Sequence, residues 1–418
     1  MKYIIEGGNV LKGKINISGN KNSVFPCVAA ALLTEEEVVI ENVPQIRDVE
    51  VLIEILETIG VKVKKEANLL RVKAEKIKSG LPRDLMIRLR GSLVLVGAIL
   101  ARTGKVEFYH PGGDIIGKRG ISVHLEGFKS LGVKTHINDL KYSLKFSKED
   151  ISTPRNIFLS ERSVTATENM ILFSSLNAGV LIIRNCATEP HIVDLCRMLT
   201  QMGARFEGIG TDTLKIIGAK NLTGTKFKLR ADYIEVGTYA IAGAITRGEI
   251  TVDLGSNDID LDPVFMPLSK FGLKIEKDQS RFIFSGAKLH SVERIVTNIW
   301  PGFPTDLMSA AIVLATQSKG VTLCHDWMFE SRMFFIDKLI AMGANITIAD
   351  PHRVLVYGPS QLRGREVETP DIRAGMALVL AALIAKGSSI INRVELIERG
   401  YEDVVGKLTL LGAQIRKI

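Results

Sequence analysis

Cysteine is scarce in this sequence, and closely spaced histidines are missing. The four cysteines form no Cys-x-x-Cys pair, and the seven histidines form no His-x-x-x-His pair. Such pairs are typical of zinc sites, and the cysteines also lack the regular spacing of a disulfide framework. We therefore expect no metal ion and reduced, mostly buried thiols at Cys27, Cys186, Cys196 and Cys324.

Long apolar runs are also absent. The longest are Leu93–Ala101 and Ala374–Ala385, well short of the roughly 18–20 residues that a bilayer-spanning helix needs. Glu6 lies within the stretch that a signal peptide would keep apolar. The sequence therefore predicts a cytoplasmic protein without a membrane span.

Aromatic residues make up only 6% of the chain, with no basic arm and no aromatic RNA-binding strand. The net charge is +8, but the 54 Lys and Arg residues are scattered along the chain. Nucleic acid is therefore disfavoured as a partner. The excess of basic over acidic residues is consistent with binding of anionic lipid or of a phosphorylated small molecule. A hydrophobic content of 46% over 418 residues predicts a globular protein of two or three domains.

One short phrase, apolar–apolar–Gly–small–x–apolar, recurs along the whole chain. In each copy the glycine is predicted to end a helix in the left-handed conformation, directly before a strand. Successive glycines are 72, 71, 69, 71 and 69 residues apart, which predicts six repeats of one structural unit. These glycines are Gly60, Gly132, Gly203, Gly272, Gly343 and Gly412.

A second series of glycines predicts another helix-to-strand junction inside the repeats. With both junctions, the predicted order of strands and helices in each unit is β-α-β-α-β-β. An open solenoid is the alternative architecture, but solenoid repeats are commonly about 20–50 residues long. Longer units can instead close on their neighbours. The second series is Gly104, Gly179, Gly248, Gly320 and Gly387.

The sixth copy is incomplete, and the N-terminal segment resembles the missing piece. Residues 4–13 resemble in sequence residues 216–224 and 356–364, which follow the glycine phrase of earlier repeats. We therefore expect the first strands to complete the last unit and to bring both chain ends into one domain.

Grouping the units by three predicts two domains. Residues 20–231 would form one domain, with a lid loop at 110–121, and residues 1–19 plus 232–418 would form the other. Because the chain would then cross twice between them, a hinge and a cleft are expected.

Unusual polar residues gather at the entry to each unit's first helix. The rest of each of these helices is almost wholly apolar and therefore expected to be buried. A helix N-terminus disfavours a cation unless an anion is present, yet Lys21, Arg90, Arg162 and Arg373 all stand at such entries. A lone Arg there is ordinarily exposed or paired, but four at six equivalent positions predict an anion-binding chamber.

Two further segments contain candidate binding or catalytic residues. Residues 110–120 hold four glycines, two cations and the carboxylate of Asp114, a composition typical of a mobile lid or of a surface turn. In residues 397–402, Arg399 stands between Glu398 and Glu402. These charged residues either belong to a functional site, or the two glutamates pair with Arg399 on the surface.

Taken together, these residues resemble the UDP-N-acetylglucosamine 1-carboxyvinyltransferases, a family of enolpyruvyl transferases, over essentially the whole chain. The related family that acts on shikimate 3-phosphate begins its first helix with a Gly-Ser-Lys-Ser type of motif, which is absent here. The resemblance implies an α/β fold of two inside-out α/β barrels, each of three βαβαββ repeats, joined by a double-crossing hinge. The matching motifs are Ile17–Asn22, Pro111–Gly113 with Gly117 and Arg119, Phe303–Asp306, Glu330–Arg332, Asp371–Arg373 and Arg399–Glu402.

The resemblance implies transfer of the enolpyruvyl group of phosphoenolpyruvate to the 3′-hydroxyl of UDP-N-acetylglucosamine. The reaction would pass through a tetrahedral phospho-ketal and release phosphate, with no metal and no organic cofactor, as the first committed step of peptidoglycan synthesis. Asp306 would accept the hydroxyl proton and Asp114 would protonate C3, with Lys21 and Arg399 as further catalytic residues.

Two sets of binding residues follow from the same resemblance. Phosphoenolpyruvate would be held by Lys21, Asn22, Arg119, Arg332, Arg373 and Arg399. The nucleotide sugar would contact Asn22, Arg90, Arg119, Gly120, Ile121, Ser122, Val123, Ser163, Val164, Asp306 and Met328.

Position 114 departs from the family pattern. Most members have a cysteine there, which acts as the acid and is alkylated by fosfomycin. Asp114 can still deliver a proton in a desolvated site, but it cannot form a stable thioether. The sequence therefore predicts an active enzyme that is insensitive to fosfomycin.

Four other departures concern the nucleotide-sugar residues. Gly120 and Ser122 replace the usual Pro and Asp, Glu161 stands where a Lys often meets the diphosphate, and Thr165 replaces a Gly. These changes leave open a paralogue with another acceptor, and a non-catalytic nucleotide-sugar binder is the alternative from another functional class. The sequence does not determine the oligomeric state.

Overall fold

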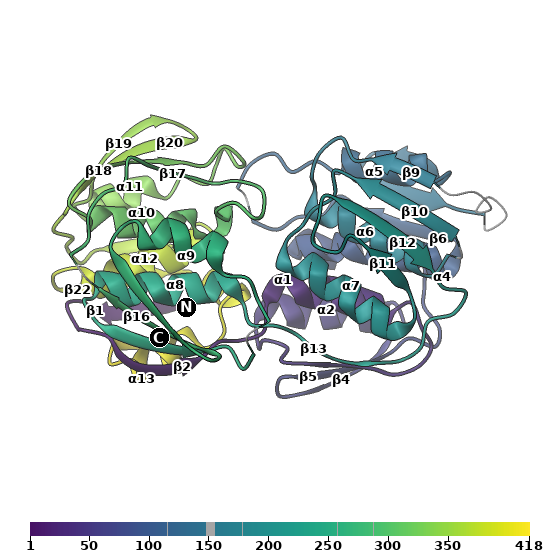
Figure 1. Cartoon of the computed structure of the whole chain (residues 1–418), viewed down its shortest axis with the longest axis horizontal. Helices are drawn as coiled ribbons and strands as arrows, with labels where there is room; N and C mark the ends of the chain where they lie inside the picture. Colours follow the sequence, from purple (N-terminus) through teal and green to yellow (C-terminus); the bar gives the residue numbers. More distant parts are fainter. Residues whose placement is uncertain (115, 148–154, 178, 257, 287) are drawn as a thin grey trace. The chain divides into compact units, whose positions relative to one another are not determined.

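The computed structural model describes the chain except residues 115, 148–154, 178, 257 and 287. The chain forms two compact units (Figure 1). Unit 1 contains residues 1–18, 114–118 and 231–418, and unit 2 contains residues 19–113 and 119–230. Residues 114–118, in the middle of the expected lid, therefore belong with unit 1, although the residues on both sides of them belong to unit 2.

Unit 2 contains the elements of the first three repeats. In chain order they are α1 (Lys21–Ala31), β3 (Val38–Glu41), α2 (Arg47–Thr58), β4 (Lys62–Glu66), β5 (Leu69–Lys73), α3 (Arg83–Arg88), the 3₁₀ helix η1 (Arg90–Val94), α4 (Leu95–Thr103), β6 (Lys105–Tyr109), α5 (Ser122–Ser130), β7 (Lys134–Asn138), β8 (Lys141–Lys145), β9 (Arg155–Phe158), α6 (Val164–Ser175), β10 (Gly179–Arg184), α7 (Pro190–Met202), β11 (Arg205–Glu207), β12 (Thr213–Gly218) and β13 (Lys226–Lys228).

Unit 1 contains the N-terminal strands and the elements of the last three repeats. They are β1 (Lys2–Glu6), β2 (Lys12–Asn16), α8 (Tyr233–Ile245), β14 (Glu249–Asp253), α9 (Asp262–Ser269), β15 (Leu273–Asp278), β16 (Arg281–Gly286), β17 (Arg294–Val296), the 3₁₀ helix η3 (Thr305–Leu307), α10 (Met308–Thr316), β18 (Gly320–His325), α11 (Ile336–Ala341), β19 (Asn345–Asp350), β20 (Arg353–Gly358), β21 (Glu366–Glu368), α12 (Ile372–Ile384), β22 (Ser388–Asn392), the 3₁₀ helix η4 (Val394–Arg399), α13 (Val404–Leu410) and β23 (Gln414–Lys417).

The sheets repeat one topology, as the glycine spacing predicts. In the described part of the chain there are six sheets, and five of them have four strands. In these five, one edge strand runs parallel to its neighbour and the remaining pairs are antiparallel. The orders are β13-β3-β5-β4, β9-β10-β12-β11, β2-β14-β16-β15, β17-β18-β20-β19 and β21-β22-β1-β23, and the sixth sheet is β6-β8-β7.

The predicted helix-ending glycines adopt the left-handed conformation. All six of the first series have φ between +83° and +118°. The second series lies at helix-to-strand junctions as predicted, and at Gly248, between α8 and β14, it is Arg247 that takes the left-handed conformation, with φ +55°. Gly248 is instead needed for close packing, since a Cβ there would lie 1.8 Å from the Leu11 carbonyl oxygen.

The N-terminal strands divide between two sheets. Strand β1 lies between β22 and β23, antiparallel to both, so it completes the last repeat as expected. Strand β2 does not, because it pairs in parallel with β14 of the fourth repeat. Strand β13, which precedes α8 in the chain, similarly pairs with β3 of the first repeat.

The first helix of each repeat is buried on nearly every side, and the second helix on one face only. Almost every residue of α8, α10 and α12 is buried, and Figure 1 shows these helices inside their unit with strands around them. Helices α1, α4 and α6 are buried in the same way in unit 2. Sheets therefore lie outside helices, and the N-termini of the buried helices bring polar groups to one end of each core.

Three further observations concern disulfides, membrane-spanning helices and metal sites. All four cysteines are buried and unpaired. Within the described residues, no helix has the length and apolar character to cross a membrane. The same residues contain no group of three or more His, Cys, Asp or Glu side chains that could hold a metal ion.

Candidate active site

In unit 1, Asp306 is the centre of a cluster of charged side chains. It lies in η3, directly before the buried helix α10. Its Oδ1 accepts a hydrogen bond from Arg332 Nη2 at 3.0 Å, and its Oδ2 accepts from Arg373 Nε at 3.0 Å and Nη2 at 2.9 Å. The two arginine side chains are only 2% and 5% exposed, whereas Asp306 is 28% exposed. Two desolvated cations thus hold one carboxylate at the surface of the core.

The start of α12 supports this cluster. Asp371 is the N-cap of the helix and accepts hydrogen bonds from the backbone N–H groups of Arg373 at 2.9 Å and Ala374 at 3.0 Å. Burial raises the pKa of Asp371, although Arg332, 3.9 Å away, opposes the rise. Burial alone would lower the pKa of Arg373, but Asp306, Tyr401 and Asp232 together outweigh it and raise that pKa. Arg332 Nε is buried and has no hydrogen-bond partner among the described residues.

The expected lid residue Asp114 lies against the last repeat of unit 1. Its Oδ1 is 2.6 Å from Arg399 Nη1, and both side chains are less than one-fifth exposed. Glu330 Oε1 accepts from the Lys118 backbone N–H at 2.8 Å. Gly117 has φ +139° and lies so close to Glu330 that a Cβ would be 2.3 Å from Oε2. Glycine is therefore required where this segment meets the loop that carries Arg332.

A buried carboxylate that the sequence analysis missed organises the neighbouring loops. Asp326 is fully buried, and its Oδ2 accepts from Thr305 Oγ1 at 2.5 Å, next to Asp306. Its Oδ1 accepts from the Met328 backbone N–H at 3.0 Å. Asp326 thus holds Met328, which is expected to contact the nucleotide sugar, and Thr305, the neighbour of Asp306. Nothing in the local sequence around Asp326 indicates this role.

In unit 2, Lys21 begins the buried helix α1. Its Nζ is 2.9 Å from Asp48 Oδ2, and both side chains are almost completely buried. The backbone N–H of Asn22 donates to Asn20 Oδ1 at 2.8 Å, which caps the helix. A protein carboxylate therefore neutralises the cation at this entry, as Asp306 neutralises Arg373 in unit 1.

The expected nucleotide-sugar residues of unit 2 lie at three neighbouring helix starts. Arg90 begins η1, Ser122 and Val123 begin α5, and Ser163 is the N-cap of α6, followed by Val164. Arg90 Nη2 donates to the Gly120 carbonyl at 3.1 Å. Burial lowers the pKa of Arg90 to about 10, and the positive charge of Arg119 adds to this lowering. Two guanidinium groups close enough to repel each other form a setting suited to an anion.

Two of the polar positions have ordinary surface roles. Arg162 pairs with Asp212 at 3.3 Å, so it does not join the helix-entry groups described above. Glu398 accepts from Tyr3 and pairs with Lys417. Arg399 pairs with Asp114.

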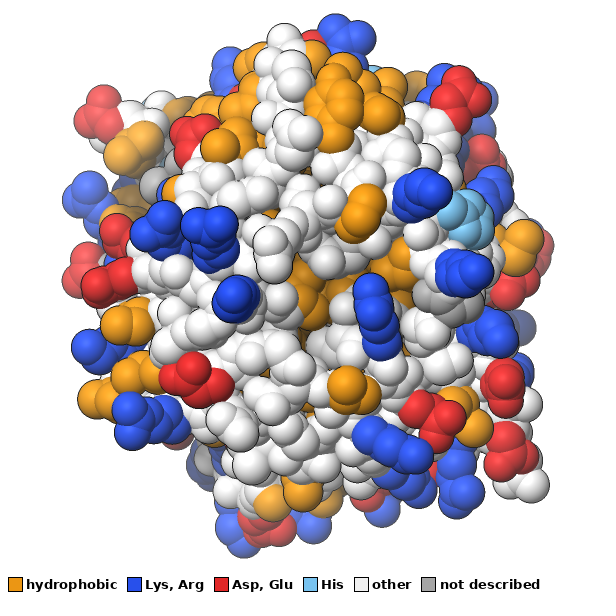
Figure 2. Space-filling model, turned by 90° about the vertical axis from the view of Figure 1, so that its left-hand side faces the viewer, with side chains coloured by type: hydrophobic (Ala, Val, Ile, Leu, Met, Phe, Trp, Pro, Cys, Tyr) orange, Lys and Arg blue, Asp and Glu red, His pale blue; other side chains and the backbone are white. Residues whose placement is uncertain are grey.

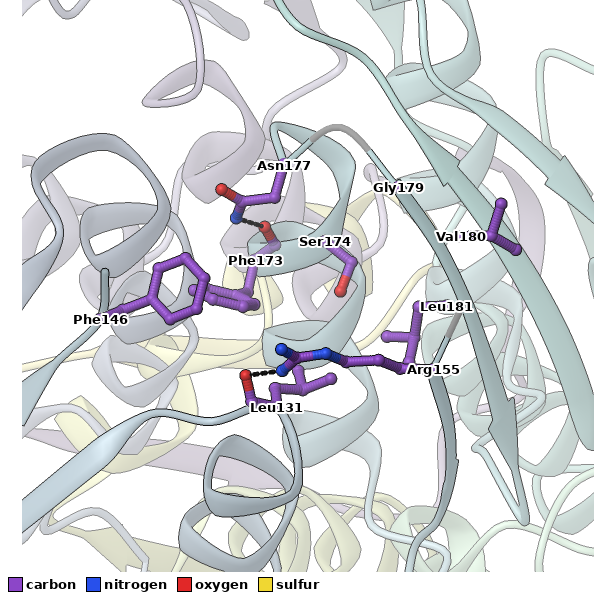
Figure 3. Close-up of a pocket in the computed structure, with 9 residues that line it drawn as sticks. All are labelled: Leu131, Phe146, Arg155, Phe173, Ser174, Asn177, Gly179, Val180 and Leu181. Atoms are coloured by element: carbon purple, nitrogen blue, oxygen red, sulfur yellow. Dashed lines mark hydrogen bonds between the residues drawn. The ribbon is translucent and has the colours of Figure 1, made fainter. Parts of the chain in front are cut away.

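A pocket elsewhere in unit 2 has a mainly apolar lining (Figure 3). It is lined by Leu131, Phe146, Arg155, Phe173, Ser174, Asn177, Gly179, Val180 and Leu181. The guanidinium of Arg155 donates to the Leu131 carbonyl, and none of the expected site residues is among these lining residues. On the face shown in Figure 2, Lys and Arg side chains are interspersed with acidic and uncharged ones.

The chain is similar to known proteins over almost its whole length. A family profile described as EPSP synthase (3-phosphoshikimate 1-carboxyvinyltransferase) matches residues 5–408. The UDP-N-acetylglucosamine 1-carboxyvinyltransferase of Borreliella burgdorferi is 44% identical, covering 100% of this chain and 99% of that protein. The enzyme of the same name from Treponema denticola is 43% identical over 99% of this chain and 98% of its own length.

Solved structures share the fold. The enolpyruvyl transferase NikO from Streptomyces tendae superimposes with a TM-score of 0.89 at 26% identity, covering 99% of this chain and 98% of that one. An EPSP synthase from Acinetobacter baumannii shares the fold at 16% identity, with a TM-score of 0.78 and complete coverage of both chains. The predicted fold class, two inside-out α/β barrels, is confirmed. The chain belongs to the EPSP synthase family of enolpyruvyl transferases, among the UDP-N-acetylglucosamine 1-carboxyvinyltransferases.

Proposed function

We propose that this protein transfers the enolpyruvyl group of phosphoenolpyruvate to the 3′-hydroxyl of UDP-N-acetylglucosamine and releases phosphate. This is the first committed step of peptidoglycan synthesis, and we propose that it takes place in the cytoplasm. The relatives named above support the choice of substrates. We further propose that residues 20–231 and residues 1–19 plus 232–418 are the two enolpyruvyl transferase domains.

The chemistry is assigned to residues of the described clusters. The sugar 3′-oxygen adds to C2 of phosphoenolpyruvate as its proton passes to Asp306, and Asp114 delivers a proton to C3. The tetrahedral phospho-ketal then loses phosphate as one C3 proton passes to the Asp114 carboxylate, which leaves the enol ether. Lys21 and Arg399 complete the catalytic set.

The single observation that carries the proposal is the pairing of Asp306 with two desolvated arginines. Guanidinium groups bind phosphate and carboxylate through paired N–H donors, and buried cations strengthen such contacts because water is excluded. The cluster thus combines an acceptor for the hydroxyl proton, Asp306, with two cations for a substrate anion, Arg332 and Arg373. The other expected phosphoenolpyruvate residues are Lys21, Asn22 and Arg119 in unit 2 and Arg399 in unit 1.

The test is phosphate release from phosphoenolpyruvate with UDP-N-acetylglucosamine as acceptor, with the product identified by mass spectrometry. We expect one phosphate per enolpyruvyl nucleotide sugar formed. Turnover with only a different acceptor would show a paralogue, and binding of the nucleotide sugar without any phosphate release would show a non-catalytic binder. Either result would refute the proposal.

Fosfomycin insensitivity is proposed on the basis of Asp114. A carboxylate cannot form the stable thioether that a cysteine forms with the drug. Native enzyme incubated with fosfomycin should keep its activity, whereas Asp114→Cys should become covalently labelled and inactivated. Rapid inactivation of the native enzyme would contradict this assignment.

A further inference from the structure

A buried hydrogen-bond network in unit 2 sets the direction of one hydroxyl group at the expected nucleotide-sugar residues. Its members are Asn169, His124 and Thr165, on helices α5 and α6, with backbone groups of η1 and α4. His124 is 3% exposed and Asn169 is completely buried. The proton positions can be deduced in order, because the first group in the network is a backbone N–H.

The orientation of the Asn169 amide is determined by backbone groups. The Gly97 N–H can only donate, so the atom 2.6 Å from it must be the amide oxygen, Oδ1. The nitrogen, Nδ2, then lies 3.0 Å from both the Leu93 and the Thr165 carbonyl oxygens, which can only accept. A flipped amide would oppose all three contacts.

The Asn169 amide in turn determines the tautomer of His124. Nδ2 of Asn169 lies 3.1 Å from His124 Nδ1. A proton on Nδ1 would point at an amide nitrogen, which cannot accept a hydrogen bond, so Nδ1 carries no proton. A neutral ring therefore carries its proton on Nε2. Burial lowers the pKa of His124 to about 3, with a contribution from the positive charge of Arg90, so the ring is neutral throughout the physiological range.

The His124 ring then determines the direction of the Thr165 hydroxyl. His124 Nε2 donates to Thr165 Oγ1 at 3.0 Å, and this is the hydroxyl's one hydrogen bond among the residues that the structure describes. Because the hydroxyl oxygen already accepts, its own proton is directed to another partner. Thr165 is partly exposed in the first turn of α6, two residues after the N-cap Ser163.

We propose that the Thr165 hydroxyl donates a hydrogen bond to a phosphate oxygen of the bound nucleotide sugar. This inference rests on the proposed function and adds a specificity residue to it. The surroundings favour an anion, because Arg90 and Arg119 bring two positive charges together and the α6 N-terminus contributes its dipole. Asn169 and His124 act as positioning residues, which make Thr165 a donor before the ligand arrives.

The test compares the affinities of native enzyme, Thr165→Val and Thr165→Ser for UDP-N-acetylglucosamine, UDP and uridine. Valine keeps the shape and removes the hydroxyl, and serine keeps the hydroxyl. A hydrogen bond to a charged group is worth about 1.5–3 kcal/mol, so Thr165→Val should bind both phosphate-containing ligands about 10- to 100-fold more weakly. Uridine, measured by competition, should bind all three proteins alike, and Thr165→Ser should bind like the native enzyme.

Thr200→Val is the matched control, because Thr200 donates to the Cys196 carbonyl at 2.8 Å in α7, away from the network. It should leave all three affinities unchanged. Equal loss of uridine and UDP affinity in Thr165→Val would mean that the hydroxyl acts only through the fold, and unchanged UDP affinity would mean that it makes no ligand contact. Either outcome overturns the inference. Native enzyme that binds no uridine nucleotide would instead refute the proposed function, and this inference with it.

Nitrogen NMR of the histidine rings tests the positioning step separately. His124 should carry its proton on Nε2 and none on Nδ1, without change between pH 5 and pH 8. A protonated Nδ1 would overturn the deduced direction of the Thr165 hydroxyl.

Discussion

Replacing Asp306 by asparagine removes one negative charge with almost no change in shape. The carboxylate now accepts from both Arg332 and Arg373. An asparagine keeps one acceptor oxygen and turns a donor toward the other guanidinium. We expect Asp306→Asn to lose turnover by about 10²- to 10⁴-fold, the usual contribution of a general base, and to lose stability as well.

The loss of stability follows from the burial of the two arginines. Removing one partner of a buried ion pair costs about 3–5 kcal/mol. Asp306 is 28% exposed and Arg332 keeps Asp371 at 3.9 Å, so the lower end, about 3 kcal/mol, is expected. For a unit of this size, 1 kcal/mol shifts the melting temperature by about 2–4 °C, so the unit 1 transition should fall by about 6–12 °C.

Thermal unfolding followed by circular dichroism measures this shift, with Glu207→Gln as the control. Glu207 pairs with Lys215 at the surface, and the two side chains are 63% and 37% exposed. Exposed pairs contribute less than about 1 kcal/mol, so the control should melt close to the native enzyme. An Asp306→Asn variant that melts within 1 °C of native, or that keeps more than a tenth of native turnover, would refute the reasoning.

Three further predictions concern other charged residues. Arg399→Gln should weaken phosphoenolpyruvate binding about tenfold or more, measured by calorimetry, and unchanged affinity would remove Arg399 from that set. Asp326→Asn should raise the KM for UDP-N-acetylglucosamine more than the KM for phosphoenolpyruvate, because Asp326 holds Met328 and Thr305; equal effects would contradict this role. In the folded state His124 stays neutral down to about pH 3, whereas in the unfolded chain it binds a proton below about pH 6.5. The contribution of His124 to the free energy of unfolding is therefore complete only above pH 6.5 and decreases as the pH falls. Between pH 7 and pH 5 the native enzyme should therefore lose about 2 kcal/mol more unfolding free energy than His124→Asn, and parallel pH profiles from urea unfolding would contradict this.

Sequence patterns predict the repeat because it depends on local rules. A left-handed residue at the end of a helix is energetically easy only for glycine, so Gly60 and Gly412 identify helix ends without knowledge of the fold. The exception at Gly248 shows the limit of this rule. There Arg247 takes the left-handed conformation, and Gly248 is needed because the Leu11 carbonyl leaves no room for a side chain.

The sequence also identifies residue types at the helix entries but not their partners. The resemblance to a known family selects Lys21 and Asp306, yet neither Asp48 nor Asp326 stands out in the sequence. Both are carboxylates whose partners depend on how separate repeats pack. A local pattern does not contain that information, since charged residues at helix starts are ordinarily solvated.

The amino-acid sequence by itself determined six copies of one unit, buried first helices and the family, because periodic hydrophobicity and glycine positions act over a few residues. Tertiary structure alone decided that Asp114 meets Arg399, 285 residues away in the chain, and that His124 directs the hydroxyl of Thr165. Hydrogen bonds and ion pairs require atoms to meet within a few tenths of an ångström. That precision arises only when the packed helices and sheets place their side chains.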